Sequence, residues 1–121
     1  MSDQPSLYER LGGAETIASI SSEIVDRHLA NPTIQVRFVD SDVDTLKRLV
    51  TEFFSMGSGG PANYSGRDMV TTHRGMNLNE RELVAVFDDV LAALDTHEID
   101  AASRNEVLGI LYSMKDEVLF Q

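Results

Sequence analysis

Apolar residues recur every three or four positions along most of this chain, as they do on one face of an α-helix. The first such stripe predicts a helix from residue 15 to residue 29, ended by Asn31 and Pro32. Three more stripes predict further helices, and their members are Val43, Leu46, Leu49, Val50, Phe53 and Phe54; then Leu83, Val86, Phe87, Val90, Leu91 and Leu94; then Val107, Leu111, Met114 and Val118. No strand-like alternation competes with these patterns, so the sequence predicts an all-α fold.

Polar residues stand where the expected helices should begin. Serine, asparagine or aspartate at such a position accepts hydrogen bonds from free backbone N–H groups of the first turn. The expected caps are Ser6 with Glu9, Ser41 with Asp44, Asn79 with Glu82, and Asp100. Gly12 and Gly13 are expected to stop the first short helix or turn it sharply.

The stretch from residue 55 to residue 68 interrupts the helical pattern. It is rich in glycine, serine, proline and asparagine, which predicts an irregular connection with little regular structure. A short helical turn should follow and carry Met69, Val70 and His73. Helical spacing places His73 on the same side as Met69 or Val70, so this side can face a pocket.

Length and composition limit the classes of protein that fit the chain. With 121 residues and no cysteine, residues 1–121 are expected to form a single domain without disulfides or thiolate metal sites. No apolar run is long enough to span a membrane, and the first residues lack the basic start and apolar stretch of a secretory signal. We therefore expect a cytoplasmic protein.

Acidic residues outnumber basic ones. Twenty Asp and Glu residues against ten Lys and Arg residues give a formal net charge of -10. Such a charge repels phosphate backbones and anionic lipid surfaces, so no nucleic acid and no membrane is expected as a partner. Most carboxylates lie on the polar faces of the expected helices, where a solvated surface is their expected role, and no acid/base pair stands out.

Three histidines are the candidates for metal chemistry. The separations of His28, His73 and His97 do not match those of a zinc site. A helical histidine among apolar neighbours is more often structural than a metal ligand, so the residues alone leave both interpretations of His73 open. His28 is expected to be a partly buried, hydrogen-bonded ring or plain surface, and His97 to be exposed in a turn.

Several short segments give the chain a resemblance to a known family. They are SLYERLGG at 6–13, HLANP at 28–32, RF at 37–38, EFF at 52–54, GGP at 59–61, Tyr64, GRDM at 66–69, and His73. In order and separation these segments resemble the group I truncated haemoglobins over nearly the whole chain. The resemblance implies a shortened globin fold, in which two antiparallel helix pairs form a two-over-two sandwich around haem. In that fold a loop replaces most of the helix before the proximal histidine, which suits the irregular stretch at 55–68.

The resemblance also implies a cofactor, haem b (iron protoporphyrin IX), and its axial ligand. His73 matches the proximal histidine, whose neutral imidazole donates to iron while its other nitrogen hydrogen-bonds nearby backbone or water. Phe38 matches the phenylalanine that packs on the haem face near the distal side. Ordinary core packing would satisfy Phe38 equally well.

Further positions match the walls of the haem pocket. The distal helix is matched by Leu46, Val50, Phe53 and Phe54, and the proximal side and haem edge by Met69, Met76, Leu78, Leu83 and Val86. Tyr64, Arg67 and Lys47 are candidates to meet the haem propionates, because charge-assisted hydrogen bonds favour such residues. For the apolar residues the alternative is core packing, and for the polar ones exposed surface.

Three distal positions depart from the family pattern. Val25 stands where many members have a tyrosine, Val50 where a glutamine is common, and Leu49 where some members have a second, iron-coordinating histidine. A hydrogen bond to a charged acceptor contributes about 1.5–3 kcal/mol, and an apolar pocket withholds this from a dioxygen ligand. We expect a sixth position that is open or holds loosely bound water, and that favours carbon monoxide and nitric oxide. A register shift of one residue would place Thr51 at the glutamine position instead.

Three classes of function fit this interpretation. The first is reversible binding of diatomic gas ligands, namely oxygen, carbon monoxide and nitric oxide. The second is a haem enzyme for nitric oxide dioxygenation or nitrite reduction, or with a peroxidase-like side activity, which would need an electron donor such as a reductase. The third is a gas or redox sensor, or an acidic helical interaction module that has lost haem. We favour the first class and expect a monomer or weak homo-oligomer.

Overall fold

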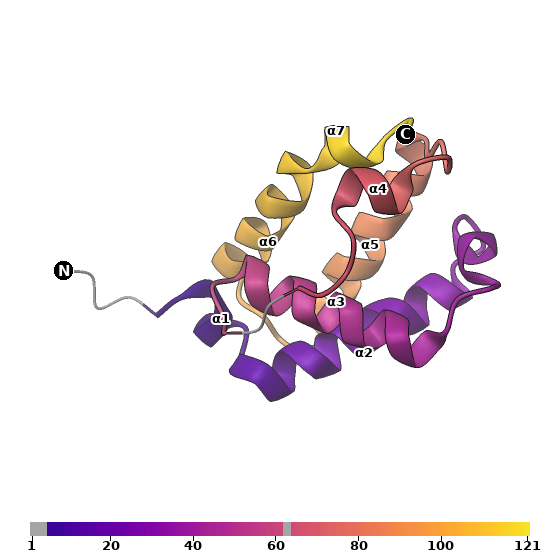
Figure 1. The fold of residues 1–121 in the computed structure, drawn as a ribbon. Helices are drawn as coiled ribbons and strands as arrows, with labels where there is room; N and C mark the ends of the chain where they lie inside the picture. The colour runs from indigo at the N-terminus through magenta and orange to yellow at the C-terminus, as the bar shows by residue number, and fades with distance from the viewer. Residues whose placement is uncertain (1–4, 62–63) are drawn as a thin grey trace.

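The computed structural model describes residues 5–61 and 64–121, and in them the chain folds into helices joined by turns (Figure 1). The helices are α1 (Leu7–Arg10), α2 (Gly13–Ala30), the 3-10 helix η1 (Gln35–Phe38), α3 (Val43–Gly57), α4 (Met69–His73), α5 (Glu80–Thr96), α6 (Ala101–Ser113) and α7 (Lys115–Val118). No strand occurs in the described residues, so the predicted all-α fold is confirmed. The first four residues, and residues 62 and 63 of the expected irregular connection, lie outside the described residues.

Side-chain caps begin most of the longer helices. Asn79 accepts from the backbone N–H of Glu82, whose side chain accepts from the backbone N–H of Asn79, so the predicted capping box of α5 is present. The expected cap of α3 is wrong by one residue: Asp42, and not Ser41, accepts from the backbone N–H of Asp44. The reason is that Ser41 still belongs to the preceding turn, where its N–H donates to the carbonyl of Phe38.

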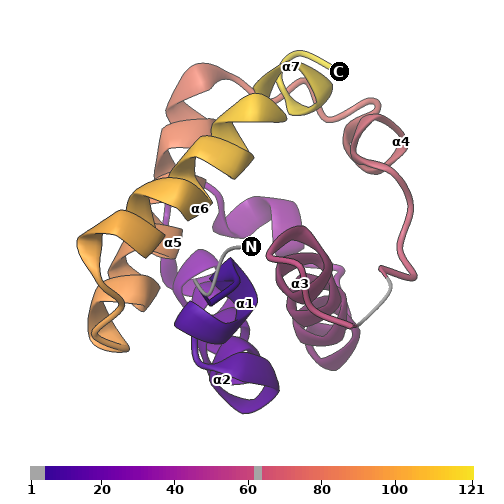
Figure 2. The same ribbon diagram turned by 90° about the vertical axis from the view of Figure 1, so that its left-hand side faces the viewer.

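The helices form two pairs that cross. In Figure 2, α5 and α6 lie side by side on one side of the molecule and α2 with α3 lie on the other. Helix α2 packs against both α3 and α5, so it joins the two pairs. Their common core is apolar and is formed by Leu7, Leu11, Ile17, Ile20, Ile24, Val90, Ala93, Leu94 and Val107. No helix among the described residues is both long enough and apolar enough to cross a membrane.

The C-terminal end of the chain holds the segment that follows α4. The predicted last helix breaks at Met114, so that α6 and α7 are separate. Beyond α7, the backbone N–H of Phe120 donates to the carbonyl of Leu78, and that of Asn77 to the carbonyl of Gln121. Helix α7 also packs against α4. The C-terminal residues therefore hold in place both α4, the helix that carries His73, and the segment that follows it.

Gly60 makes a close contact that a larger residue would disturb. A Cβ atom at Gly60 would lie 2.3 Å from a ring carbon of Tyr8 in α1 and 2.7 Å from Ser55 Oγ in α3. We expect Gly60→Ala to lower the free energy of unfolding by about 1–3 kcal/mol, measured by urea unfolding. Gly109→Ala is the control, because a Cβ there meets open space within α6 and should stabilise the helix by about 0.5–1 kcal/mol. Equal stabilities of the Gly60→Ala variant and the unmodified chain would contradict the contact.

Candidate functional site

Two adjoining cavities lie between α3 on one side and α4 with α5 on the other. One has a volume of about 230 Å³ and the other of about 460 Å³. Leu46, Thr72 and Val86 line both, so the two cavities meet at these side chains. The first is also lined by Ile24, His28, Leu49, Val50, Phe53, Phe54, Tyr64, Met69, Val90 and Leu111, and the second by Ile34, Arg37, Phe38, Ser41, Arg67, His73, Met76, Leu78 and Glu82. Together they suit a large, mainly apolar ligand with a polar edge.

His73 is the last residue of α4 and lines the second cavity. Asp68 caps the start of this helix, and its carboxylate accepts from the backbone N–H of Thr71 at 3.3 Å. His73 Nδ1 lies 2.7 Å from the backbone carbonyl oxygen of Met69, one turn earlier. A carbonyl oxygen can only accept, so Nδ1 carries the hydrogen, and in the neutral tautomer Nε2 has the lone pair. This is the arrangement in which a histidine serves as a metal ligand.

The second cavity has a charged rim on the side of η1. Arg37 donates from Nε to Glu82 Oε2 at 2.8 Å and from Nη2 to Glu82 Oε1 at 3.0 Å. These hydrogen bonds are the main reason that the pKa of the Glu82 carboxyl lies below its ordinary value. Because Glu82 also closes the capping box of α5, the pair fixes η1, and with it Phe38, to the start of that helix.

The Arg37–Glu82 pair should make stability depend on pH. We expect Glu82→Gln to lower the free energy of unfolding at neutral pH by about 1 kcal/mol, since one charge-assisted pair is lost. The folded-state pKa of Glu82 is lowered, so its contribution is present above the ordinary pKa of a glutamate and is lost as the pH falls through the folded-state value. Urea unfolding at several pH values should therefore show the two proteins converging in acid. A difference that persists in acid would exclude this ionic origin.

Most of the residues predicted from the sequence line these cavities. The structure brings together Phe38, Leu46, Leu49, Val50, Phe53, Phe54, Tyr64, Arg67, Met69, His73, Met76, Leu78 and Val86. Three of the aromatic members pack together: the ring of Phe53 lies edge-on to those of Phe54 and Tyr64, with centroids 5.9 and 5.8 Å apart. Tyr64, which lies outside any helix, is thereby packed against α3.

Three predicted residues are not among the described residues that line either cavity. Val25 is fully buried within α2. Lys47 projects from α3 toward α2, where its Nζ lies 2.9 Å from Asp26 Oδ1. Leu83 lines a groove on the outer face between α5 and α6. The structure therefore does not support direct contact of these three side chains with a ligand in the cavities.

Sequence reasoning missed several residues that line the cavities. His28 was expected to be structural or exposed, and it is buried but also lines the first cavity. Arg37 and Thr72 were not singled out, although Arg37 stands next to Phe38 in a segment that did carry a signal. The pairing of Arg37 with Glu82 spans 45 residues and leaves no local pattern that could have revealed it.

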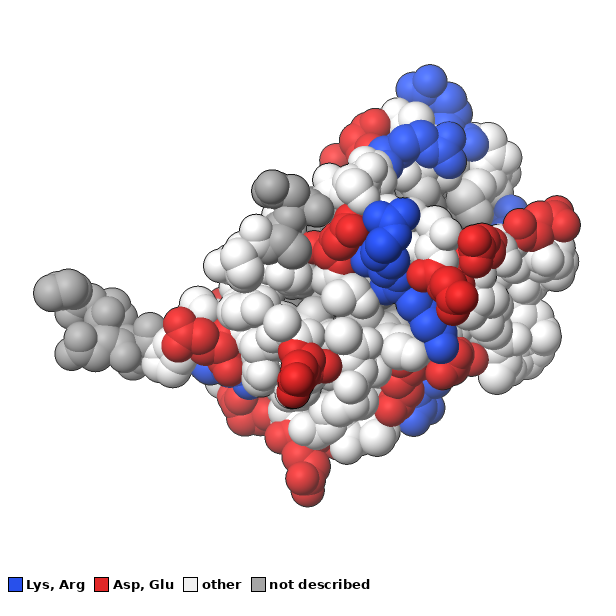
Figure 3. Space-filling model, turned by 60° about the horizontal axis from the view of Figure 1, so that its bottom comes forward, with Lys and Arg blue, Asp and Glu red and all other residues white. Residues whose placement is uncertain are grey.

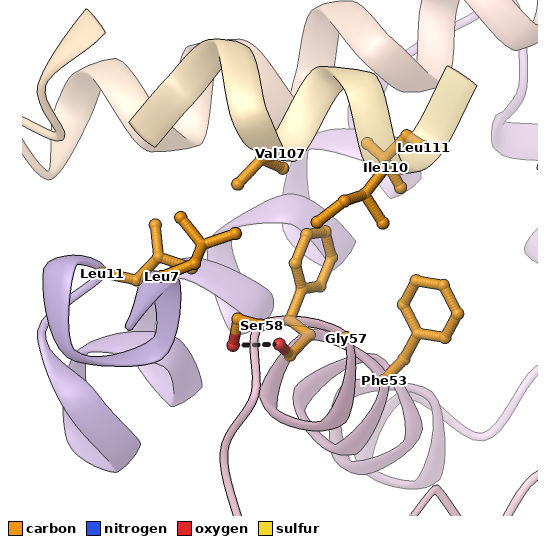
Figure 4. A pocket seen from close by; sticks show the side chains of 9 residues that line it. Leu7, Leu11, Phe53, Gly57, Ser58, Val107, Ile110 and Leu111 are labelled. Atoms are coloured by element: carbon orange, nitrogen blue, oxygen red, sulfur yellow. Dashed lines mark hydrogen bonds between the residues drawn. The ribbon is translucent and has the colours of Figure 1, made fainter. Parts of the chain in front are cut away.

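A third, small cavity adjoins the first one. Its volume is about 20 Å³, and Figure 4 shows it enclosed by side chains from α1, the end of α3 and α6. Phe53, Phe54 and Leu111 line both this cavity and the first one. Ser58 lies at its edge, and its hydroxyl donates to the carbonyl of Phe54 at 2.6 Å. With that hydroxyl engaged, the small cavity continues the apolar surface of the first.

Several basic side chains on the outside of the protein form ion pairs with acidic neighbours. On the face drawn in Figure 3, acidic and basic groups lie side by side. Ion pairs join Arg27 to Glu23 at 2.8 Å and Arg48 to Glu52 at 3.1 Å. Within the described ranges, no three His, Asp or Glu side chains gather as a candidate metal-ion site.

Comparisons with known proteins find relatives that share this fold. The profile of the bacterial-like globins matches residues 6–120. The group 1 truncated haemoglobin of Tetrahymena pyriformis is 27% identical over 119 residues, covering 98% of this chain and 98% of that protein. The group 1 truncated haemoglobin GlbN of a Synechocystis species is 30% identical over 92 residues, covering 73% of this chain and 74% of that protein.

Solved structures give the same result. The truncated haemoglobin from Tetrahymena pyriformis in its Fe(III) form superposes with a TM-score of 0.93 at 26% identity, covering 97% of this chain and 100% of that one. The 2/2 haemoglobin from a Synechococcus species, in the cyanomet state and with covalently attached haem, superposes with a TM-score of 0.87 at 25% identity, covering 95% of this chain and 98% of that one. The crossed helix pairs are thus the two-over-two arrangement expected from the sequence.

Proposed function

Because the chain belongs to the bacterial-like globin family, as a truncated haemoglobin of group I, we propose that it binds one haem b through His73 and uses it to bind diatomic gas ligands reversibly. The observation that carries the proposal is the state of His73. Its Nδ1 is occupied by the Met69 carbonyl and its Nε2 is free, on the wall of a cavity of about 460 Å³. A free, oriented imidazole nitrogen at an apolar cavity is what an axial haem ligand requires.

The remaining lining residues fit the same group. The two adjoining cavities provide a broad apolar space on both sides of Leu46 and Val86. Phe38 lines the second cavity together with His73, and its ring stacks on His28, with centroids 5.7 Å apart and planes at 18°. A b-type haem, held without a thioether link, is proposed because the chain contains no cysteine.

Arg67 and Tyr64 are proposed to bind the haem propionates. Arg67 lines the second cavity, and no ion pair among the described residues includes it. A guanidinium free to turn toward the cavity can form two parallel hydrogen bonds to a carboxylate. Arg37 is less suited to this role because Glu82 already occupies its Nε and Nη2 atoms.

When bound, haem would supply an iron with a coordination position that accepts oxygen, carbon monoxide or nitric oxide. What the chain adds around that position is an apolar wall formed by Leu46, Leu49 and Val50 of α3. These side chains are apolar and donate no hydrogen bond. They therefore favour carbon monoxide and nitric oxide, which depend less on a donor than oxygen does.

Finer features belong to the same proposal. We treat residues 1–121 as one truncated globin domain, acting in the cytoplasm as a monomer or weak homo-oligomer. A reductase would be a partner only if the iron turns over substrate. Consumption of nitric oxide or nitrite by the haem protein with a reductase present would establish such an enzyme, whereas ligand binding without turnover supports reversible binding.

Absorption spectra of the haem-loaded protein test the proposal. Hemin added to the purified chain should give an intense near-ultraviolet porphyrin band that saturates at one equivalent. Reduction with dithionite and addition of carbon monoxide should each shift that band. A band that never saturates, as for hemin adsorbed to an apolar surface, would refute the proposed function.

A further inference from the structure

The first cavity contains few polar side chains. Among the described residues that line it, these are His28, Tyr64 and Thr72. The hydroxyl of Thr72 donates to the backbone carbonyl of Arg67 at 3.1 Å, so its hydrogen is already used. The ring of Tyr64 is packed edge-on against Phe53, in the segment proposed to meet the haem edge. His28, which comes from α2 on another side of the cavity, is the polar group that no role above explains.

The imidazole of His28 is held in one orientation. Only 7% of the residue is exposed, and its Nδ1 lies 2.7 Å from Asp89 Oδ2 in α5. The same carboxylate oxygen accepts from Asn31 Nδ2 at 3.2 Å, and one face of the ring stacks on Phe38. A histidine that is fixed by a carboxylate on one nitrogen resembles the oriented histidines of metal sites and catalytic dyads.

This hydrogen bond also determines what the other ring nitrogen can do. A carboxylate only accepts, so Nδ1 carries the hydrogen. Burial lowers the pKa of His28, and this effect outweighs the opposing influence of Asp89, so the ring is neutral at neutral pH. Nε2 is then a hydrogen-bond acceptor, and no side chain in the described part of the chain is bonded to it.

We propose that His28, oriented by Asp89, accepts a hydrogen bond from a proton-carrying ligand in the first cavity, such as water, hydrogen sulfide or hydrogen peroxide. The inference rests on the proposed binding of haem at His73, because the haem iron would be the other partner of such a ligand. The apolar wall would otherwise leave such a ligand without a partner, and an unpaired polar group in an apolar site is costly. Ligands without a hydrogen, such as carbon monoxide, gain nothing from the acceptor. The cavity thus favours ligands that carry a hydrogen able to donate to Nε2 over ligands that carry none.

Hydrogen sulfide is a suitable probe for the acceptor. Ferric haem protein is titrated with sulfide at mildly acidic pH, where the undissociated form dominates, and binding is followed by absorption. His28→Leu removes the acceptor while keeping an apolar side chain of similar size. We expect this variant to bind sulfide about fivefold more weakly, the loss of one hydrogen bond, while the affinity of the ferrous protein for carbon monoxide changes less than about twofold.

Asp89 is tested as a positioning residue. Asp89→Ala frees the ring and should weaken sulfide binding about as much as His28→Leu. Asp89→Asn keeps an oxygen that can accept from both His28 and Asn31, so it should restore most of the affinity. If Asp89 acted only in folding, the sulfide affinity would not depend on whether residue 89 carries an oxygen that accepts a hydrogen bond. His97→Leu is the control. The Nδ1 of His97 also donates to a backbone carbonyl, that of Ala93, but the residue lines only a polar hollow on the surface and neither of the two main cavities.

The outcomes separate this inference from the proposed function. If hemin binds in one equivalent but all the variants bind sulfide as the unmodified protein does, the role of His28 is refuted and haem binding stands. If sulfide and carbon monoxide weaken in parallel in His28→Leu and in Asp89→Asn, the pair is only structural and the inference also fails. If hemin does not bind specifically, both proposals fall. Weaker sulfide binding with unchanged carbon monoxide binding, rescued by Asp89→Asn, supports the inference.

Discussion

Replacing His73 with glycine should lower the affinity of the protein for hemin at least about a hundredfold, because the iron loses its protein ligand. The apolar walls of the cavities remain, so some hemin would still adsorb. The near-ultraviolet band should be weaker, shifted and no longer saturate at one equivalent. Added imidazole should enter the space left by the side chain and restore the spectrum of the unmodified protein. A hemin titration followed by absorption measures each of these effects.

The chain offers a matched control for this substitution. His97 also donates from Nδ1 to the carbonyl four residues earlier, at 2.9 Å, as His73 does at 2.7 Å. His97 lies at the end of α5 next to Glu23, away from the two main cavities. His97→Gly should therefore leave hemin binding unchanged. If His73→Gly also left the spectrum and the affinity unchanged, the axial ligand would have to be sought elsewhere, first at His28.

The helices of this fold could be predicted from local signals. Asn79 and Glu82 form a capping box over three residues, and Asp100 accepts from the backbone N–H of Ser103, so both starts depend on neighbours in sequence. The 3-10 helix η1 and the break at Met114 were not predicted. The pairing of the C-terminal residues with residues 77 and 78 is a long-range contact, and helical periodicity contains no information about it.

The residues that line the candidate site could be predicted from the sequence where the apolar face of a helix meets a single neighbour. The apolar stripe of α3 faces the cavities with Leu46, Leu49 and Val50, as expected. Helix α5 packs against both α2 and α6. Its apolar stripe therefore does not tell which of its residues face the cavities. Val86 faces the cavities while Leu83, three residues earlier, turns to the groove against α6. Periodicity tells that a residue is on an apolar face, but not which neighbour it meets.

Charged and polar members of the site were harder to predict. Lys47 was a candidate to meet the haem propionates, with exposed surface as the alternative, and its Nζ pairs with the exposed carboxylate of Asp26 on α2. His28 was expected to be a partly buried, hydrogen-bonded ring or plain surface; the ring is buried and hydrogen-bonded, but its partner Asp89, 61 positions away, was not predicted. Polar side chains are directed by single partners, and partners distant in sequence become visible only in the folded chain. Which polar side chains can hydrogen-bond to a ligand is therefore seen only in the structure.

Replacing Leu46 with glutamine should slow the dissociation of oxygen from the haem-loaded ferrous protein. Leu46 lines both main cavities, and a glutamine of similar length would place an amide N–H where the present wall is apolar. A dioxygen ligand is polarised and accepts hydrogen bonds. A bond to a charged acceptor contributes about 1.5–3 kcal/mol, which corresponds to roughly ten- to hundredfold slower release. Stopped-flow measurement of oxygen displacement by carbon monoxide gives the rate.

Leu46→Met is the matched control, because it keeps the volume of the side chain without adding a donor. Its oxygen release should stay within about threefold of that of the unmodified protein, which allows for small changes in packing. Dissociation of carbon monoxide should differ little between the glutamine and methionine variants, since that ligand is a weak acceptor. If oxygen left the glutamine and methionine variants at the same rate, α3 would not face the ligand, and the apolar wall could not be the reason for a preference among gases.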